Sequence, residues 1–117
     1  MTEAQHQATL IKWTQQPTVR QAFPELALLY HIPNGGSRNP IEGKHLKAQG
    51  VKSGVPDLHL PVNRKGFNSL YIELKTEKGR PSENQKWWID KLKEQGNYAC
   101  VCHGWKEAKD CLLWYLK

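Results

Sequence analysis

The chain has 117 residues, of which 38% are hydrophobic, so it is large enough for one domain over residues 1–117 with its own core. No stretch approaches the roughly 20 apolar residues of a membrane-spanning helix. The first residues lack the features of a secretory signal, so we expect a cytoplasmic protein. Seventeen Lys and Arg against eleven Asp and Glu give a formal charge of +6, which favours polyanionic partners such as DNA or RNA over a merely soluble basic surface.

The first third of the sequence predicts a helix followed by a strand. Apolar side chains at helical spacing occupy residues 3–16, and Pro17 is expected to end that helix. The short apolar run LALLYHIP (26–33) is typical of a buried strand.

A loop and a short helix are expected next. The sequence NGGSRNP (34–40) is rich in turn-forming residues. Asn39 fits a helix N-cap, and Pro40 fits the first helical position. The helix that they begin is expected to stop near Gly50.

The following segment predicts two strands joined by a turn. In VPDLHLPV (55–62) the leucines alternate with Asp57 and His59, so the two kinds of side chain face opposite ways. NRKG (63–66) indicates the turn, and SLYIELK (69–75) is the partner strand.

The last third predicts a helix, a strand and a second helix. Ser82 and Gln85 form a capping box that begins a helix running to about Gln95. YACVCH (98–103) is expected to be a strand, and the closing helix begins near Trp105. The complete order α-β-α-β-β-α-β-α predicts an α/β fold with a mixed central sheet flanked by helices.

Three cysteines, an odd number, argue against a disulfide framework. Cys100, Cys102 and His103 stand close together, but the spacing C-x-C-H lacks the C-x2-C pair of common zinc sites. Because free cysteine packs as a small hydrophobe, we interpret these two cysteines and Cys111 as core thiols rather than zinc ligands.

Two acidic residues and one lysine interrupt apolar strand sequences. Asp57 heads the first strand of the hairpin, and Glu73 and Lys75 share a face of the second. If the strands pair, Asp57 lies beside Glu73, and two close carboxylates repel each other unless a cation stands between them. Mg²⁺ favours such a pair and can serve phosphodiester hydrolysis. The alternative is an exposed Glu–Lys pair on a solvated sheet face beside an unrelated turn aspartate.

The order of these motifs resembles the VRR-NUC (virus-type replication-repair nuclease) domain of the PD-(D/E)xK nuclease superfamily. GVPD (54–57), a strand ending in ELK (73–75) and the helix start GRPSENQKWW (79–88) follow one another as in that family, and the likeness extends from Glu3 to the last helix. The resemblance implies a restriction-endonuclease-like fold and DNA endonuclease activity dependent on Mg²⁺ or Mn²⁺, with one or two ions. Standalone members are typical of bacteriophages and bacteria, and the phage type implies homodimers acting on branched DNA such as four-way junctions.

The resemblance also implies roles for individual residues. Asp57 and Glu73 correspond to metal ligands, with the main-chain carbonyl of Leu74 as a third. Lys75 corresponds to the catalytic lysine.

Two further residues keep two interpretations each. Glu3 corresponds to a helical glutamate that contacts metal-bound water, but an acidic residue there is also favoured by the helix dipole. Gln85 matches a helix glutamine of the family, and it also closes the capping box with Ser82. These two roles of Gln85 are expected to compete for one side chain.

The segment before the acidic residues is rich in basic side chains. We expect it to be mobile and to order on DNA, with phosphate contacts from Arg38, Lys44, Lys47 and Lys52. For any single lysine the alternative is a solvated helix face. For the whole chain it is an inactive DNA-binding module, or an accessory subunit of a replication or recombination complex, that binds without cleaving.

Overall fold

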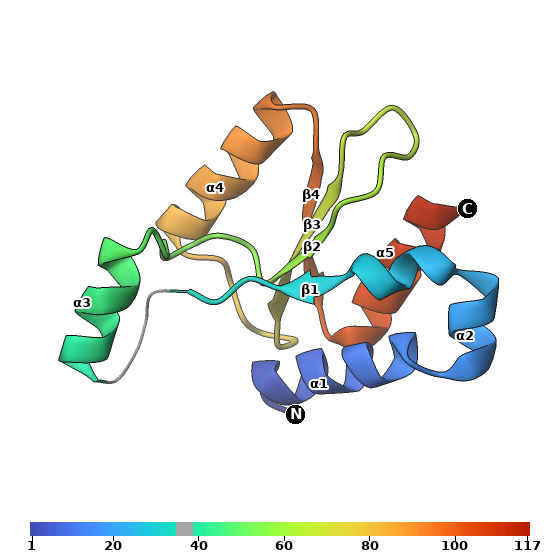
Figure 1. Ribbon diagram of the computed structural model, residues 1–117, viewed down its shortest axis with the longest axis horizontal. Coiled ribbons are helices and arrows are strands. Elements are labelled where there is room, and N and C mark those ends of the chain that lie inside the picture. The colour runs from blue at the N-terminus through green and yellow to red at the C-terminus, as the bar shows by residue number, and fades with distance from the viewer. Residues whose placement is uncertain (35–38) are drawn as a thin grey trace.

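The computed structural model describes residues 1–34 and 39–117 (Figure 1). Its helices are α1 (Glu3–Thr14), α2 (Pro17–Ala22), α3 (Pro40–Ala48), α4 (Glu83–Glu94) and α5 (Trp105–Leu116), with a 3-10 helix η1 (Pro24–Leu28). Its strands are β1 (Tyr30–His31), β2 (Leu58–Leu60), β3 (Leu70–Lys75) and β4 (Tyr98–His103). No helix in the described ranges is long and apolar enough to cross a membrane.

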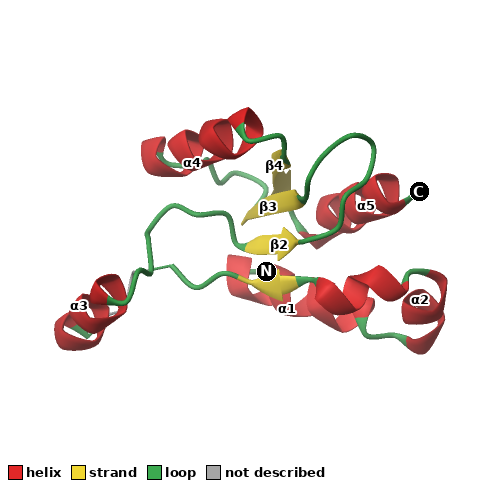
Figure 2. Cartoon of the chain, turned by 45° about the horizontal axis from the view of Figure 1, so that its top comes forward, coloured by secondary structure: helices red, strands yellow, loops and turns green. Residues whose placement is uncertain are grey.

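The strands form a mixed sheet in the order β1-β2-β3-β4. Strands β1, β2 and β3 pair antiparallel, whereas β4 runs parallel to β3 and is reached through the crossover helix α4. Helix α5 packs on β3 and β4 and against α1, while α4 packs on β4 (Figure 2). The predicted α/β fold, a mixed sheet flanked by helices, is confirmed.

The core lies between the sheet and the helices α1 and α5. Leucines at alternate positions of β2 and apolar residues at alternate positions of β3 share this face, as the period of two requires. Burying each large apolar side chain contributes about 1.5–3 kcal/mol. The fully or nearly fully buried members include Leu10, Leu58, Leu60, Leu70, Ile72, Leu74, Leu112 and Tyr115.

The prediction that Pro17 closes the first helix misses a second helix. Helix α1 ends at Thr14, and Pro17 then occupies the first turn of α2. Proline suits that position because its missing N–H would have no helical partner there.

The prediction of a buried strand over residues 26–33 is wrong. Its beginning lies in η1, and β1 is only two residues long, with both side chains exposed. A 3-10 turn sends successive side chains in different directions, so Leu26 is buried whereas Leu28 is 51% exposed. A short apolar run does not by itself distinguish the two structures.

Helix α3 stands apart from the sheet (Figures 1 and 2). Asn39 is its N-cap, as predicted, because the side chain accepts hydrogen bonds from the next turn, and the helix ends close to the predicted stop. The Asn84 side chain ties the following loop to α4 by donating to the Ser53 carbonyl (2.8 Å). Gly54 is held against this contact at a φ of +91°, where an added Cβ would lie 2.7 Å from Asn84 Nδ2. Only glycine fits such a position without strain.

Candidate functional site

The hairpin pairing brings Asp57 beside β3. Leu58 is the antiparallel partner of Ile72, so Asp57, one residue before β2, lies opposite Glu73. Its Oδ2 accepts a hydrogen bond from the Leu74 N–H (2.8 Å), which fixes the carboxylate against the strand. Sequence reasoning missed this bond, because a backbone donor leaves no mark in the residue type. The Leu74 carbonyl stays a predicted ligand.

Glu73 is a buried carboxylate with an incomplete set of partners. It is 1% exposed, and its Oε2 accepts from Gln85 Nε2 (3.2 Å) and lies 3.4 Å from Lys75 Nζ. Within the described chain its Oε1 has no hydrogen-bond partner. Burial first, and then the Asp57 carboxylate, raise the pKa of Glu73 to about 8 despite the opposing effect of Lys75. The fold therefore makes this group costly to ionise unless another positive charge arrives.

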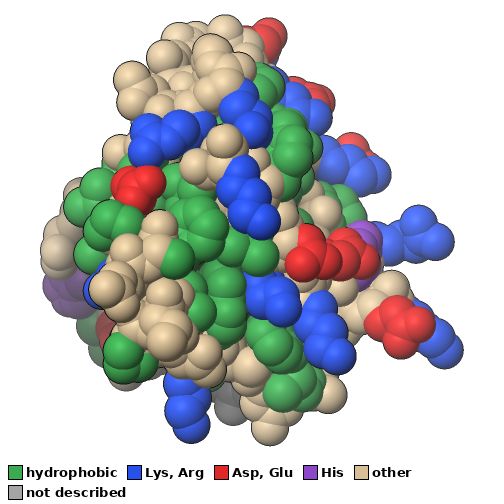
Figure 3. All heavy atoms as spheres, turned by 90° about the vertical axis from the view of Figure 1, so that its right-hand side faces the viewer, with side chains coloured by type: hydrophobic (Ala, Val, Ile, Leu, Met, Phe, Trp, Pro, Cys, Tyr) green, Lys and Arg blue, Asp and Glu red, His purple; other side chains and the backbone are tan. Residues whose placement is uncertain are grey.

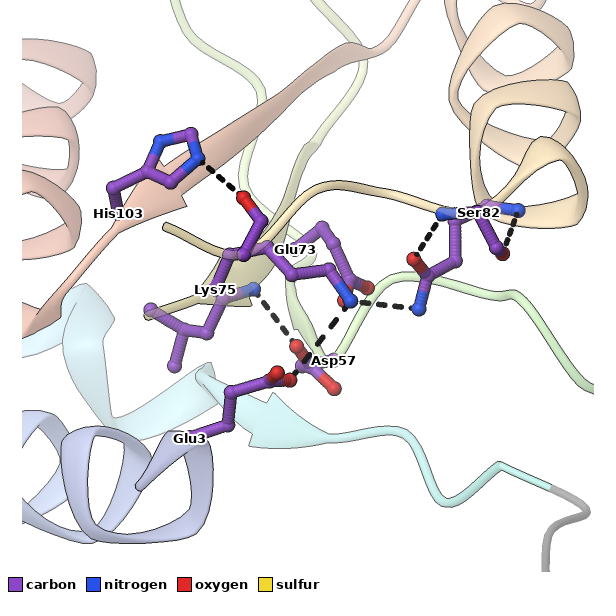
Figure 4. A network of polar contacts seen from close by, with 9 residues as sticks. Glu3, Asp57, Glu73, Lys75, Ser82 and His103 are labelled. Carbon is purple, nitrogen blue, oxygen red and sulfur yellow. Dashed lines mark hydrogen bonds and ion pairs between the residues drawn. The ribbon is translucent and has the colours of Figure 1, made fainter. Parts of the chain in front are cut away.

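Lys75 lies between two carboxylates at the end of β3 (Figure 4). Its Nζ is 3.4 Å from Glu73 Oε2 and 3.9 Å from Glu3 Oε1, and the residue is 8% exposed. The alternative of a solvated Glu–Lys pair is therefore wrong. The buried Lys75 ammonium therefore offsets part of the negative charge of the Glu3 and Glu73 carboxylates.

The Gln85 side chain closes the helix cap and reaches Glu73 at the same time, so the two contacts do not compete. Its Oε1 accepts from the Ser82 N–H (2.8 Å) to complete the capping box of α4. Its Nε2 donates to Glu73 Oε2 from the other end of the same amide. One side chain therefore caps the helix and orients the buried carboxylate.

Glu3 is brought to the cluster by the first turn of α1. A carboxylate oxygen from each of Glu3, Asp57 and Glu73 lies within 4.8 Å of the other two, so these residues are grouped as ligands of one ion would be. Glu3 and Asp57 also line an open cavity of about 690 Å³ along α1, together with His31. The acidic cluster is thus reachable from solvent on its α1 side.

The predicted basic residues are only partly brought together. Lys44 and Lys47 are exposed on α3, and Arg38 lies outside the described residues. Lys47 and Lys52 line a shallow cavity of about 520 Å³ with Trp87, whose side chain is 52% exposed. On the face opposite α3, Lys and Arg side chains are scattered among hydrophobic and acidic ones (Figure 3).

The mixed sheet, with Asp57 and Glu3 grouped around the buried Glu73 and Lys75, is consistent with the class of restriction-endonuclease-like, PD-(D/E)xK folds. A model of the VRR-NUC domain family matches residues 1–106, and the chain belongs to that family. A solved structure described as a VRR_NUC domain protein is 26% identical with a TM-score of 0.82, over 99% of this chain and 88% of that chain. A search of curated proteins finds no match. The predicted resemblance is confirmed, and the family implies a nuclease whose substrate is DNA and whose members typically use divalent metals.

Proposed function

We propose that this protein is an endodeoxyribonuclease that depends on Mg²⁺, with Mn²⁺ as a substitute, and hydrolyses phosphodiester bonds at the Glu73 cluster. The observation that carries the proposal is the buried Glu73 Oε1, which lacks a partner within the described chain while a second carboxylate lies close by. A divalent cation would complete the coordination of that oxygen and offset the repulsion between Asp57 and Glu73.

The residues present fit such an ion. Asp57 and Glu73 would bind it directly, with the Leu74 carbonyl as a third ligand and Glu3 holding water at its edge. The chemistry that a divalent cation supplies is polarisation of a phosphate oxygen and a lowered pKa of bound water.

The protein side chains position and balance charge around this site. The Lys75 ammonium is placed to hold a water molecule for attack, or to offset the negative charge that develops on the phosphate. Gln85 holds Glu73 Oε2, so that the carboxylate cannot rotate freely. Hydrolysis is expected to leave a 5′-phosphate and a 3′-hydroxyl.

The DNA would approach along α1 and α3. The open cavity beside Glu3 and Asp57 gives a phosphate access to the carboxylates. Lys47 and Lys52 supply positive charge near the exposed Trp87, which offers a face for stacking on an unpaired base. Lys44 and Arg38 are also proposed to contact phosphates.

A homodimer acting on branched DNA is the finer part of the proposal. One site cuts one strand, so two copies are needed to cut both strands of a duplex or a symmetrical pair of strands in a four-way junction. An unpaired base at a branch point would suit Trp87 better than a stacked one. Light scattering of the protein alone and with junction DNA tests the stoichiometry.

The direct experiment is incubation with supercoiled plasmid, linear duplex and four-way junction, each with Mg²⁺, Mn²⁺ or EDTA. We expect cleavage with either metal, none with EDTA, and the highest rate on the junction. Calorimetric titration with Mn²⁺ counts the ions.

Glu73→Ala is the decisive variant. It should lose metal-dependent cleavage while keeping its fold, by circular dichroism, and most of its DNA affinity. Metal-dependent cleavage by purified Glu73→Ala protein would refute the assignment. Binding without cleavage by the wild-type chain would instead identify an inactive DNA-binding module.

A further inference from the structure

The three cysteines converge on the sheet face opposite Glu73. Cys100 and Cys102 are the β4 partners of Ile72 and Leu74, so they point toward α5 rather than toward α4. Helix α5 brings Cys111 onto them. Cys100 Sγ lies 3.8 Å from Cys102 Sγ and 3.6 Å from Cys111 Sγ, and all three sulfurs lie within 4.8 Å of one another.

These separations fit a shared metal ion. Zinc bound by thiolates has Zn–S distances of about 2.3 Å, so sulfurs at the corners of a tetrahedron around it are about 3.8 Å apart. The two shortest sulfur–sulfur separations here already match that edge. The third sulfur–sulfur separation, between Cys102 and Cys111, is within 4.8 Å.

The surroundings are those of a site rather than of a closed core. The prediction of three core thiols holds for Cys102, which is buried, but Cys100 and Cys111 are only half-buried. They line a cavity of about 340 Å³ whose rim carries the carboxylates Glu107 and Asp110. Apolar packing explains a buried thiol, but it does not explain three sulfurs within 4.8 Å of one another at a cavity lined by two carboxylates.

The donor set points to zinc among the thiophilic metals. Thiolates select soft ions, and zinc also accepts carboxylate oxygen or water in its fourth position. Glu107 Oε1 already accepts a hydrogen bond from the His103 N–H (3.0 Å), so Asp110 or water is the freer fourth ligand.

We infer that Cys100, Cys102 and Cys111 form a zinc site that joins the edge strand β4 to helix α5. Its role is structural. β4 is hydrogen-bonded to β3 along its whole length, so a metal that fixes β4 on α5 also fixes the strand that presents Glu73. The zinc site is separate from the acidic cluster, since it lies on the other face of the sheet and uses sulfur ligands.

The test is titration of the reduced, metal-free full chain with Co²⁺ as a spectroscopic substitute, in excess Mg²⁺ to occupy the carboxylates. We expect one Co²⁺ per chain with a strong thiolate-to-cobalt charge-transfer band, which an equimolar amount of Zn²⁺ abolishes. Zn²⁺ should also raise the melting temperature and protect the thiols from iodoacetamide, as read by mass spectrometry.

Variants separate this site from the nuclease site. Cys111→Ser, at a half-buried position, should abolish the band and weaken Zn²⁺ binding by more than about 100-fold. Glu73→Gln should keep both the charge-transfer band and the Zn²⁺ affinity of the wild type. A reduced wild-type chain that shows no charge-transfer band would overturn the inference, whatever the outcome of the cleavage assays. So would equal Zn²⁺ affinity in wild type and Cys111→Ser, or a Cys100–Cys111 disulfide that forms in the presence of Zn²⁺.

Discussion

Strand β3 and helix α3 treat their charged side chains in opposite ways. On β3 the charges of Glu73 and Lys75 are nearly removed from water, and each depends on specific neighbours. On α3 the lysines are exposed, and the helix stands apart from the sheet (Figure 1). A buried charge interacts strongly with its neighbours, because little water screens it. An exposed charge is screened by water, so each one contributes little. Substitutions should therefore act strongly and specifically on β3 and weakly and additively on α3.

The largest expected effect is on catalysis at Lys75. Lys75→Met removes the ammonium but keeps most of the side-chain volume, so the cleavage rate should fall by about 10²–10⁴-fold. Single-turnover cleavage of junction DNA measures it. Lys106→Met, at an exposed position of α5, is the matched control and should cut like wild type. If Lys75→Met also cut normally, the lysine would have only a structural role.

The second effect is a pH dependence of stability in the metal-free protein. The pKa of Glu73 is raised to about 8 from an ordinary 4.5. Between these values folded Glu73 keeps a proton that the unfolded chain has lost, so raising the pH favours unfolding by on the order of a few kcal/mol in total. Urea denaturation in EDTA between pH 5 and pH 9 should show the decline. Mg²⁺, or Glu73→Gln, should flatten it, and an equally steep decline in Glu73→Gln would exclude Glu73 as its source.

The third effect concerns the loop that joins helix α3 to the sheet. Gly54→Ala should cost about 1–3 kcal/mol, because the new Cβ meets Asn84 and the backbone φ is positive. Gly50→Ala is the control, since Gly50 has a φ of +98° but nothing within 4 Å of an added Cβ. The difference between the two free energies of unfolding isolates the steric part. Equal losses would mean that the contact with Asn84 yields without cost.

The smallest effect is expected on α3. Lys44→Gln and Lys47→Gln should each weaken DNA binding by less than about tenfold and lower the salt slope of binding by about 0.9. Fluorescence anisotropy across a range of salt concentrations measures both quantities, and cleavage at saturating protein should not change. An unchanged slope in the double variant would remove α3 from the DNA interface.

Much of the fold was predictable because its signals are local. The capping box at Ser82 and the N-cap at Asn39 depend on residues within one turn, and both were predicted. The alternation in β2 and β3 and the turn signal between them indicated a hairpin, and the observed register of that hairpin brings Asp57 beside Glu73. The run over residues 26–33 carried no period, so nothing in it favoured a 3-10 turn over a strand.

Other contacts in the molecule, in the cysteine group and in the acidic cluster, depend on how separate elements pack. Cys111 meets Cys100 because α5 packs on β4, and spacing along the chain does not encode that packing. Likewise, the approach of Glu3 to Lys75 depends on where α1 begins relative to the sheet. The sequence predicted the parts of the acidic cluster, and tertiary packing determined which of them touch.

The double duty of Gln85 restricts what can stand at that position. Glutamate would complete the same helix cap equally well, yet it would set another carboxylate against Glu73 Oε2, the oxygen that now accepts a hydrogen bond from the Gln85 amide. Asparagine would keep the neutral amide but fall one methylene short of spanning both bonds. Helix capping alone would allow glutamate or glutamine at this position. The contact with the buried Glu73 carboxylate restricts the position to glutamine.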